Sequence, residues 1–380
     1  MSIEEIHAKS ILRKAKKIDS WFVSRYGMNL YRGCCHNCSY CDGRAEGYYV
    51  EGEFGRDVAV KVNAPEKLEH ELDPAGKRKP LEKGFVMVGG GVGDSYQPAE
   101  QKYKLTARVL EVLRKRGLPV HILTKSVLVE RDRDIISGIN EMSRAVVSFS
   151  FSSVDDGISR VFEPGVPAPS RRLEALRSFA AAGIPCGMFL MPVIPFVTDT
   201  PEMIERAVRA AAGAGAGFVV FGGMTLKRGR QKEHFMGVYG GQYPRLATEC
   251  ESIYGDNKWG MPAEEYYCAL NSIFLAAARQ YRVPVRMPPE IFGDILGDNE
   301  KVIVFLEHMD YMLRMKGKKS PYGYAAYSVS KLKGHLCGAT GDLRNLKGVG
   351  PVTEKIIREI LNTGDCAYYR KITESMQGSG

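Results

Sequence analysis

The chain of 380 residues lacks the segments that carry a protein into or across a membrane. Its first twenty residues hold five Lys and Arg between isolated apolar positions, so the uninterrupted apolar core of a secretory signal is missing. No stretch reaches the length of a membrane span, because the most apolar segment, residues 183–197, is broken by three prolines. These absences predict a cytoplasmic protein that has no membrane partner.

Two further observations narrow the class of protein. Internal repeats of about 20–50 residues are missing, which argues against a solenoid. Nine cysteines are present, four of them within the eight residues 34–41, and this clustering fits a reducing compartment in which thiols bind metal. The composition therefore favours a metal-binding globular protein over a disulfide-bonded one.

Three of these clustered cysteines, Cys34, Cys38 and Cys41, are spaced Cys-x3-Cys-x2-Cys, without a fourth cysteine in that pattern. An all-cysteine iron–sulfur cluster takes four thiolates, so three ligands leave one iron open to an exogenous ligand. The same run also reads Cys35-x2-Cys38-x2-Cys41, which is typical of a ferredoxin-like loop or, with His36, of a zinc site. The spacing alone leaves these alternatives open.

With Tyr40 just before the last cysteine, the loop resembles the signature of the radical S-adenosylmethionine (SAM) superfamily. The resemblance implies a [4Fe–4S] cluster on Cys34, Cys38 and Cys41, with SAM bound at the open iron. It also implies that an electron from a reductant such as flavodoxin or ferredoxin cleaves SAM to a 5′-deoxyadenosyl radical, which takes a hydrogen atom from the substrate.

After this loop, short apolar runs alternate with helical patterns, which is the order of parallel strands joined by crossover helices. The predicted strands are Phe85–Val88, Val120–Thr124, Ala145–Phe151, Gly187–Pro192 and Phe218–Phe221. The predicted helices are Ala99–Arg116, Arg171–Ala182, one that starts at Thr200-Pro201, and one near Ala263–Tyr281. With a strand that delivers Tyr31, this makes about six β/α units.

The predicted fold is therefore α/β, a partial (β/α)6 TIM-type barrel with a small helical C-terminal appendage. We expect an N-terminal helical extension at residues 1–25 and the barrel at 26–295, with an insertion or lid at 223–262. A basic helical tail should occupy residues 296–376.

In parallel barrels, chemistry lies at the carboxyl ends of the strands. The second predicted strand ends in a glycine-rich loop, at the place where radical SAM proteins bind the methionyl amino group. The resemblance makes Gly89, Gly90, Gly91, Asp94 and Ser95 candidates for that role. The competing interpretation of the glycines is a simple turn.

The middle of the chain resembles spore photoproduct lyase and its relatives, from about Met28 to Pro195. The matching segments are Phe149-Ser-Phe, Val161–Gly165, Arg172–Ala175 and Ala182–Pro195. The resemblance implies that Lys125 and Ser150, at the ends of the third and fourth strands, hold the SAM carboxylate and amine. Tyr40, Val193 and Ile194 should border the adenine, whereas Glu163 and Arg172 fit either a structural or a functional role.

One departure from that family concerns the hydrogen donor. The bacterial lyase has a donor cysteine at the end of its second strand, where this chain reads Gly89–Val92, and a tyrosine where it has Asp42. Reversal of a thymine lesion by the same radical relay is therefore in doubt. The candidate replacements are Cys35, which adjoins the cluster, and Tyr96, with Cys186, Tyr48 and Tyr49 as further possibilities.

The C-terminal tail carries much of the chain's positive charge, with twelve Lys and Arg against five Asp and Glu in residues 311–380. Residues 343–361 resemble a helix-hairpin-helix element, for which the nucleic-acid contacts are Lys347, Gly348, Gly350, Lys355 and Arg358. Upstream, residues 311–333 interleave tyrosines with cations, as in surfaces that stack bases and follow phosphates. A plain helical hairpin and a solvated loop are the competing interpretations.

The first functional hypothesis is a radical SAM enzyme that acts on a nucleotide in DNA, by repair or modification of a lesion, with the tail holding the substrate. The second replaces DNA by RNA such as tRNA. The third is a nucleic-acid-binding protein whose cluster is only structural or redox-sensing. The sequence does not indicate an oligomeric state.

Overall fold

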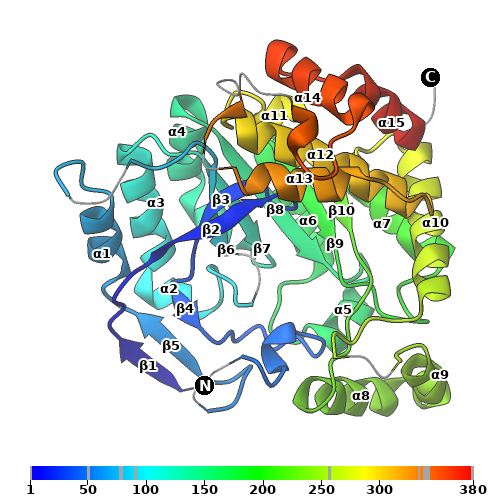
Figure 1. The fold of residues 1–380 in the computed structure, drawn as a ribbon. Helices are drawn as coiled ribbons and strands as arrows, with labels where there is room; N and C mark the ends of the chain where they lie inside the picture. The colour runs from blue at the N-terminus through cyan, green and yellow to red at the C-terminus, as the bar shows by residue number, and fades with distance from the viewer. Residues whose placement is uncertain are drawn as a thin grey trace.

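Six parallel strands form the centre of the fold, as the sequence predicts (Figure 1). The computed structural model describes residues 2–48, 52–76, 80–89, 92–255, 258–332, 334–336 and 343–377. The parallel strands are β3 (Ser24–Met28), β6 (Phe85–Gly89), β7 (Val120–Thr124), β8 (Ala145–Phe151), β9 (Cys186–Leu190) and β10 (Phe218–Phe221). They lie in the order β10-β9-β8-β7-β6-β3, and β2 (Leu12–Asp19) pairs antiparallel with β3 at the edge.

Helices connect these strands along the outer face of the sheet, so the core is a partial barrel (Figure 1). The connections are α2 (Ala99–Tyr103), α3 (Leu105–Lys115), α4 (Arg133–Met142), α5 (Asp156–Phe162), α6 (Pro169–Ala181) and α7 (Pro201–Gly213). The predicted cap of α7 is present, since the Thr200 hydroxyl accepts a hydrogen bond from the Met203 amide at 3.3 Å. No helix within the described ranges combines the length and the apolar character needed to cross a membrane.

The prediction of a helical N-terminal extension is wrong. Residues Ile3–Ile6 form β1 and Leu12–Asp19 form β2. Strand β1 pairs with β5 (Val58–Lys61), which also pairs with β4 (Tyr31–Arg32), so Tyr31 lies in a second, three-stranded sheet and not in the barrel. The partner of β1 is distant in sequence, whereas β2 forms a hairpin with β3, and the exposed lysines of β2 suit a strand at a sheet edge.

The predicted helix Ala99–Arg116 is interrupted at Lys104, whose φ of 51° separates α2 from α3. The cause is the buried carboxylate of Glu100, which accepts hydrogen bonds from the Thr106 amide at 3.0 and 3.1 Å. Glu100 also pairs with Arg131 at 2.6 Å. The break lets the Glu100 side chain accept a hydrogen bond from a backbone amide in the first turn of α3, which has no partner within the helix.

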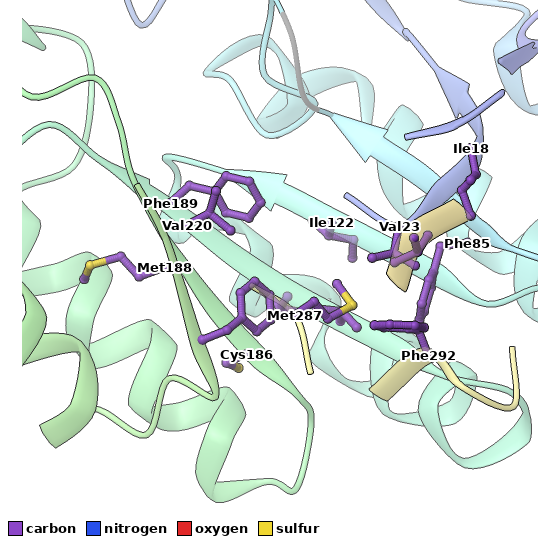
Figure 2. Packing of buried hydrophobic residues seen from close by; sticks show 14 of the residues in the cluster. Ile18, Val23, Phe85, Ile122, Cys186, Met188, Phe189, Val220, Met287 and Phe292 are labelled. Carbon is purple, nitrogen blue, oxygen red and sulfur yellow. The ribbon is translucent and has the colours of Figure 1, made fainter. Parts of the chain in front are cut away.

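The inside of the barrel and the C-terminal region share one hydrophobic cluster. Figure 2 shows Phe85 of β6 and Ile122 of β7 near Met287 and Phe292, which follow the barrel in sequence. Phe292 belongs to α11 (Pro289–Phe292), which comes after α10 (Glu264–Gln280), the helix expected near Ala263–Tyr281. The predicted domain boundary at residue 295 remains a prediction, because the cluster is continuous across it.

The helical C-terminal appendage is present and packs at the end of the sheet where the strands begin (Figure 1). It consists of α12 (Asp298–Met315), α13 (Tyr322–Ser330), α14 (Pro351–Thr363) and α15 (Ala367–Gln377). Buried Arg286, which precedes α11, lies between the rings of Trp21 and Tyr311, 4.0 and 3.5 Å from their centroids. This stacking ties α12 to the turn between β2 and β3.

Two buried histidines are held as neutral rings. Burial lowers the pKa of His121 to about 4 and that of His308 to about 3. The Nε2–H of His308 donates to the Ser20 carbonyl at 2.9 Å, and its Nδ1 lies 3.2 Å from the Tyr369 hydroxyl. Because both folded-state pKa values lie below the unfolded value of about 6.5, the unfolded chain binds more protons in the interval between them.

We therefore expect the free energy of unfolding to fall as the pH drops from about 6.5 toward about 4, by about 1.4 kcal/mol per pH unit for each histidine. Urea unfolding at a series of pH values measures this slope. The substitution His308→Gln keeps a polar side chain that does not titrate, so it should remove one histidine's share of the slope. A slope that is the same in His308→Gln and the wild type contradicts the assignment.

Candidate active site

The three predicted cluster cysteines line one cavity of about 100 Å³ at the carboxyl ends of the strands. The other lining residues are His36, Gly93, Asp94, Leu123, Thr124, Lys125 and Ser150. Lys125 directly follows β7, and Ser150 lies near the end of the adjacent β8. The parallel register of neighbouring strands thus brings the cysteine loop, Asp94, Lys125 and Ser150 together, as the sequence predicts.

Two neighbouring segments fix the cysteine loop. The side chain of Gln97 donates to the Gly33 carbonyl at 3.2 Å and accepts from the Cys35 amide at 3.0 Å. On the other side, a Cβ at Gly165 would lie 2.5 Å from the Cys35 carbonyl oxygen, so only glycine lets the segment after α5 pass there. The glycine of the Glu-Pro-Gly motif therefore has a packing role.

A buried carboxylate connects the cysteine loop to Lys125. Glu163 accepts hydrogen bonds from Lys125 Nζ at 3.0 Å, from Arg172 at 2.6 Å and from the Tyr40 hydroxyl. Burial alone would raise the pKa of Glu163, but the charges of Arg172 and Lys125 outweigh it and hold that pKa well below its usual range. Glu163 is therefore ionised at neutral pH.

The same network leaves a positive charge at the cavity. Glu163 and Arg172 are fully buried, whereas the Lys125 side chain is 15% exposed. Lys125 Nζ also donates to Ser150 Oγ at 2.9 Å. Because Lys125 and Arg172 share the single carboxylate of Glu163, the Lys125 ammonium can still attract a second carboxylate. This arrangement suits the predicted contact with the carboxylate of SAM.

Asp94 supplies a negative charge on the other side of the cavity. Its carboxylate accepts hydrogen bonds from the Thr124 hydroxyl at 2.7 Å and from the Lys125 and Tyr96 amides at 2.7 and 2.8 Å. Burial opposes ionisation, but neighbouring His36 and these amides lower the pKa of Asp94 below its ordinary value. An ionised Asp94 can hold an ammonium group. Its neighbour Ser95 is buried, and its carbonyl accepts from Thr106 at 2.6 Å.

The thiols suit iron better than they suit zinc with His36. Burial raises the pKa of Cys38 to about 12 and raises the pKa values of Cys34 and Cys41 as well, so deprotonation has to be driven by metal binding. His36 Nδ1 lies 2.9 Å from the Gly165 carbonyl oxygen, and its Nε2 lies 3.2 Å from Asp94. Because both ring nitrogens face oxygen atoms, His36 is not placed as a zinc ligand, and the three cysteines stay the predicted ligands of a [4Fe–4S] cluster.

The structure explains why glycine occupies position 89, the first residue of the stretch where the lyase has its donor cysteine. Gly89 has a φ of 85°, and a Cβ there would lie 2.4 Å from the Leu123 carbonyl oxygen. Any side chain at Gly89 would therefore clash with the backbone of β7. Gly90 and Gly91, the other glycines predicted to bind SAM, lie outside the described residues.

The two candidate hydrogen donors do not line the cavity. Cys35 Sγ lies 4.0 Å from the Arg56 carbonyl oxygen and is half-buried. Tyr96 is fully buried. Burial and the nearby carboxylate of Asp132 both raise the pKa of the Tyr96 hydroxyl. Cys35 adjoins Cys34 in sequence, but its side chain does not point into the cavity that Cys34 lines. Cys186 lies in β9, Tyr48 is exposed, and Tyr49 falls outside the described residues.

The predicted adenine-binding residues lie beside the cysteine loop. Tyr40, Cys38 and Ile194 belong to one buried hydrophobic cluster, together with Phe162 and Phe235. Val193 is also buried, but it belongs to the main core. Ile194 is held by a hydrogen bond from its amide to the Thr198 hydroxyl at 2.6 Å.

The predicted insertion at residues 223–262 packs on this cluster and clamps the residue after Cys41. It contains α8 (Arg230–Gln242) and α9 (Ala247–Ser252). Asp42 accepts hydrogen bonds from Gln231 at 3.0 Å and Thr225 at 3.2 Å, and it pairs with Lys227 at 3.1 Å. Sequence reasoning missed Gln97 and Gln231, because neither belongs to a local pattern. The position of Asp42, where the lyase family has a tyrosine, was the available signal.

Comparisons with known proteins agree with this geometry. The Radical SAM superfamily domain matches residues 28–211. An uncharacterized protein of Mycobacterium tuberculosis is 32% identical over 67% of this chain and 74% of its own length. An uncharacterized protein of Methanocaldococcus jannaschii is 30% identical over 56% of this chain and 75% of its own.

Solved structures of spore photoproduct lyase share the fold. The alignment with one variant covers 73% of this chain and 79% of the variant's length, with a TM-score of 0.54 and 18% identity. The alignment with another variant, which has bound AdoMet and dinucleoside spore photoproduct, covers 71% of this chain and 78% of the variant's length, with a TM-score of 0.50 and 18% identity. At this identity the likeness concerns the fold.

The cysteine loop, the strand-end residues and the matched domain together show that the chain belongs to the radical SAM superfamily. It is therefore an enzyme of that class, and its cofactors are a [4Fe–4S] cluster and SAM. The hypothesis of a binding protein with a merely structural cluster is wrong, since the chain belongs to a family of SAM-cleaving enzymes.

Replacing Lys125 by Met should weaken SAM binding about ten-fold to a hundred-fold, because a charge-assisted hydrogen bond contributes about 1.5–3 kcal/mol. Calorimetric titration of the anaerobically reconstituted protein with SAM measures the affinity. Arg171→Met is the matched control, since Arg171 is a surface cation paired with Glu174. Equal SAM affinities of Lys125→Met and the wild type would remove Lys125 from the site.

The placement of Cys35 leads to a second expectation. Because its sulfur faces Arg56 and not the cavity, Cys35→Ala should keep the product yield and the pattern of hydrogen-isotope incorporation of the wild type. Turnover in deuterated buffer with mass spectrometry of the product measures both. A loss of deuterium incorporation in Cys35→Ala would restore Cys35 as the donor.

Proposed function

We propose that this radical SAM enzyme acts on a nucleotide within DNA, by repairing or modifying a lesion. The bound cluster and SAM supply a carbon radical after one electron arrives from a reductant such as flavodoxin or ferredoxin. Lys125, Asp94 and Ser150 hold the charged groups of SAM, and Tyr40 and Ile194 border its adenine. The cytoplasmic location expected from the cysteines remains part of this proposal.

The observation that carries the choice of a nucleic acid is the basic tail and its attachment to the barrel. Residues 311–380 of this region hold twelve Lys and Arg against five Asp and Glu, and buried Arg286 and His308 fix the tail to the β2–β3 turn. A basic surface held rigidly on a radical-forming barrel suits a polyanionic substrate, since phosphate neutralisation supplies affinity independent of sequence.

Two further arguments favour a DNA lesion. Solved structures with the same fold include spore photoproduct lyase complexed with dinucleoside spore photoproduct. A target atom inside a duplex is reached only when its nucleotide leaves the stack, and this costs least at a damaged site. The absence of room for a donor at Gly89 supports chemistry that returns hydrogen differently from the bacterial lyase.

The predicted helix-hairpin-helix contacts fit this proposal in part. Lys347, Gly348, Gly350 and Lys355 are exposed, and Gly348 has the positive φ of a tight turn, 83°. Arg358 instead donates to Glu354 within α14 at 2.7 and 2.9 Å, which neutralises part of its charge. Before the turn, the described residues form only the short 3-10 helix Leu343–Asn345 in place of a full first helix, so the complete motif stays a prediction.

The test is anaerobic reconstitution followed by measurement of 5′-deoxyadenosine with dithionite as reductant. We expect irradiated DNA to stimulate its formation above the levels with undamaged DNA, tRNA or no nucleic acid, and the lesion to disappear or change mass. Stimulation by tRNA alone would replace DNA by RNA as the substrate. Stimulation by undamaged DNA equal to that by irradiated DNA would rule out a lesion.

A further inference from the structure

Helix α13 presents an unusual pair of faces. Tyr322, Ala325, Ala326 and Val329 are buried against the rest of the appendage. Tyr324 and Tyr327 point outward and are 54% and 50% exposed, and Lys331 is exposed one turn further on. Large aromatic side chains at spacings of three and four residues normally turn inward, so their exposure on a well-packed helix calls for a partner.

The exposed side chains already form a stacked group. The rings of Tyr324 and Tyr327 lie 6.4 Å apart with 20° between their planes. Lys331 Nζ lies 5.0 Å from the centroid of the Tyr327 ring. A row of two nearly parallel rings ending in an ammonium group offers flat faces to bases or sugars and a charge to phosphate.

The predicted hairpin extends the same surface. A Cβ at Gly348 would lie 2.7 Å from Cδ1 of Tyr324, so glycine allows the turn to approach the α13 face closely. Lys347, beside this glycine, is exposed and adds a second cation. Segments that are 24 residues apart in sequence thus join into one aromatic and basic patch, made of Tyr324, Tyr327, Lys331 and Lys347.

We propose that this patch is an anchoring site for a DNA strand of the substrate, separate from the cavity where the chemistry occurs. The inference rests on the proposed function and adds where the polymer is held. Tyr324 and Tyr327 contact bases or sugars, and Lys331 and Lys347 contact phosphates. Charge complementarity supports this occupant, because residues 311–380 around the patch have more than twice as many cations as anions.

The position of the patch sets the size of the substrate. The ends of α13 border Trp21 and residues 81–83, which precede β3 and β6, whereas the cavity follows the ends of β7 and β8 (Figure 1). The two sites are therefore separated by about the length of a strand, roughly 20 Å, which corresponds to about six nucleotides. A dinucleotide cannot occupy both sites.

The test compares Tyr324→Ala/Tyr327→Ala with Tyr324→Phe/Tyr327→Phe, which keeps both rings and serves as the matched control. Fluorescence anisotropy at fixed salt measures binding to an irradiated duplex of about 20 base pairs. The alanine variant should bind about ten-fold to a hundred-fold more weakly, and the phenylalanine variant should bind like the wild type. Thermal unfolding followed by circular dichroism checks that all three proteins fold.

A second measurement uses substrate length. Formation of 5′-deoxyadenosine with an irradiated dinucleotide should be equal in all three proteins, whereas at low concentrations of the irradiated duplex only the alanine variant should be slow. Equal duplex affinity of the alanine variant and the wild type would overturn the anchoring site and leave the DNA-directed activity intact. If the wild type itself gains no turnover from DNA, the proposed function fails, and the anchoring site fails with it.

Discussion

The carboxylate of Glu163 is the interaction on which the candidate site depends. It joins Tyr40 of the cysteine loop, Lys125 at the end of β7 and Arg172 of α6, all below the protein surface. Removing it would leave two buried or half-buried cations facing each other, a change that typically costs about 3–5 kcal/mol. The ion pairs thus set the distance between the cysteine loop and the strand ends, and they leave Lys125 directed at the cavity.

Much of this arrangement could be predicted from the sequence. The short and mostly apolar run Ala145–Phe151 predicted β8 with the bounds that the structure shows. Because neighbouring parallel strands end at the same edge, Lys125 and Ser150 could be expected to meet, and their side chains lie 2.9 Å apart. Glu163 and Arg172 remained ambiguous, since a motif does not reveal whether a charge is paired.

The rest depends on contacts between distant segments, which leave no local pattern. Residues Ile3–Ile6 become a strand because Val58–Lys61 is available as a partner 55 residues further along the chain, and the expectation of a helical extension at residues 1–25 missed this pairing. Gln97 and Gln231 hold the cysteine loop from positions 62 and 191 residues away. The direction in which Cys35 points is likewise a property of the folded loop, and for this reason proximity in sequence was a poor guide to a hydrogen donor.

The clamp on Asp42 makes cofactor loading and the covering insertion thermodynamically linked. Gln231 binds both the Tyr40 carbonyl oxygen at 2.9 Å and the Asp42 side chain at 3.0 Å, so the backbone beside Cys41 and the start of α8 are held by the same contacts. Metal binding at the three thiolates therefore also stabilises the bound position of residues 225–231. By linkage, detachment of that segment weakens metal binding by the same free energy. In this enzyme, cofactor loading and the position of the insertion should therefore change together.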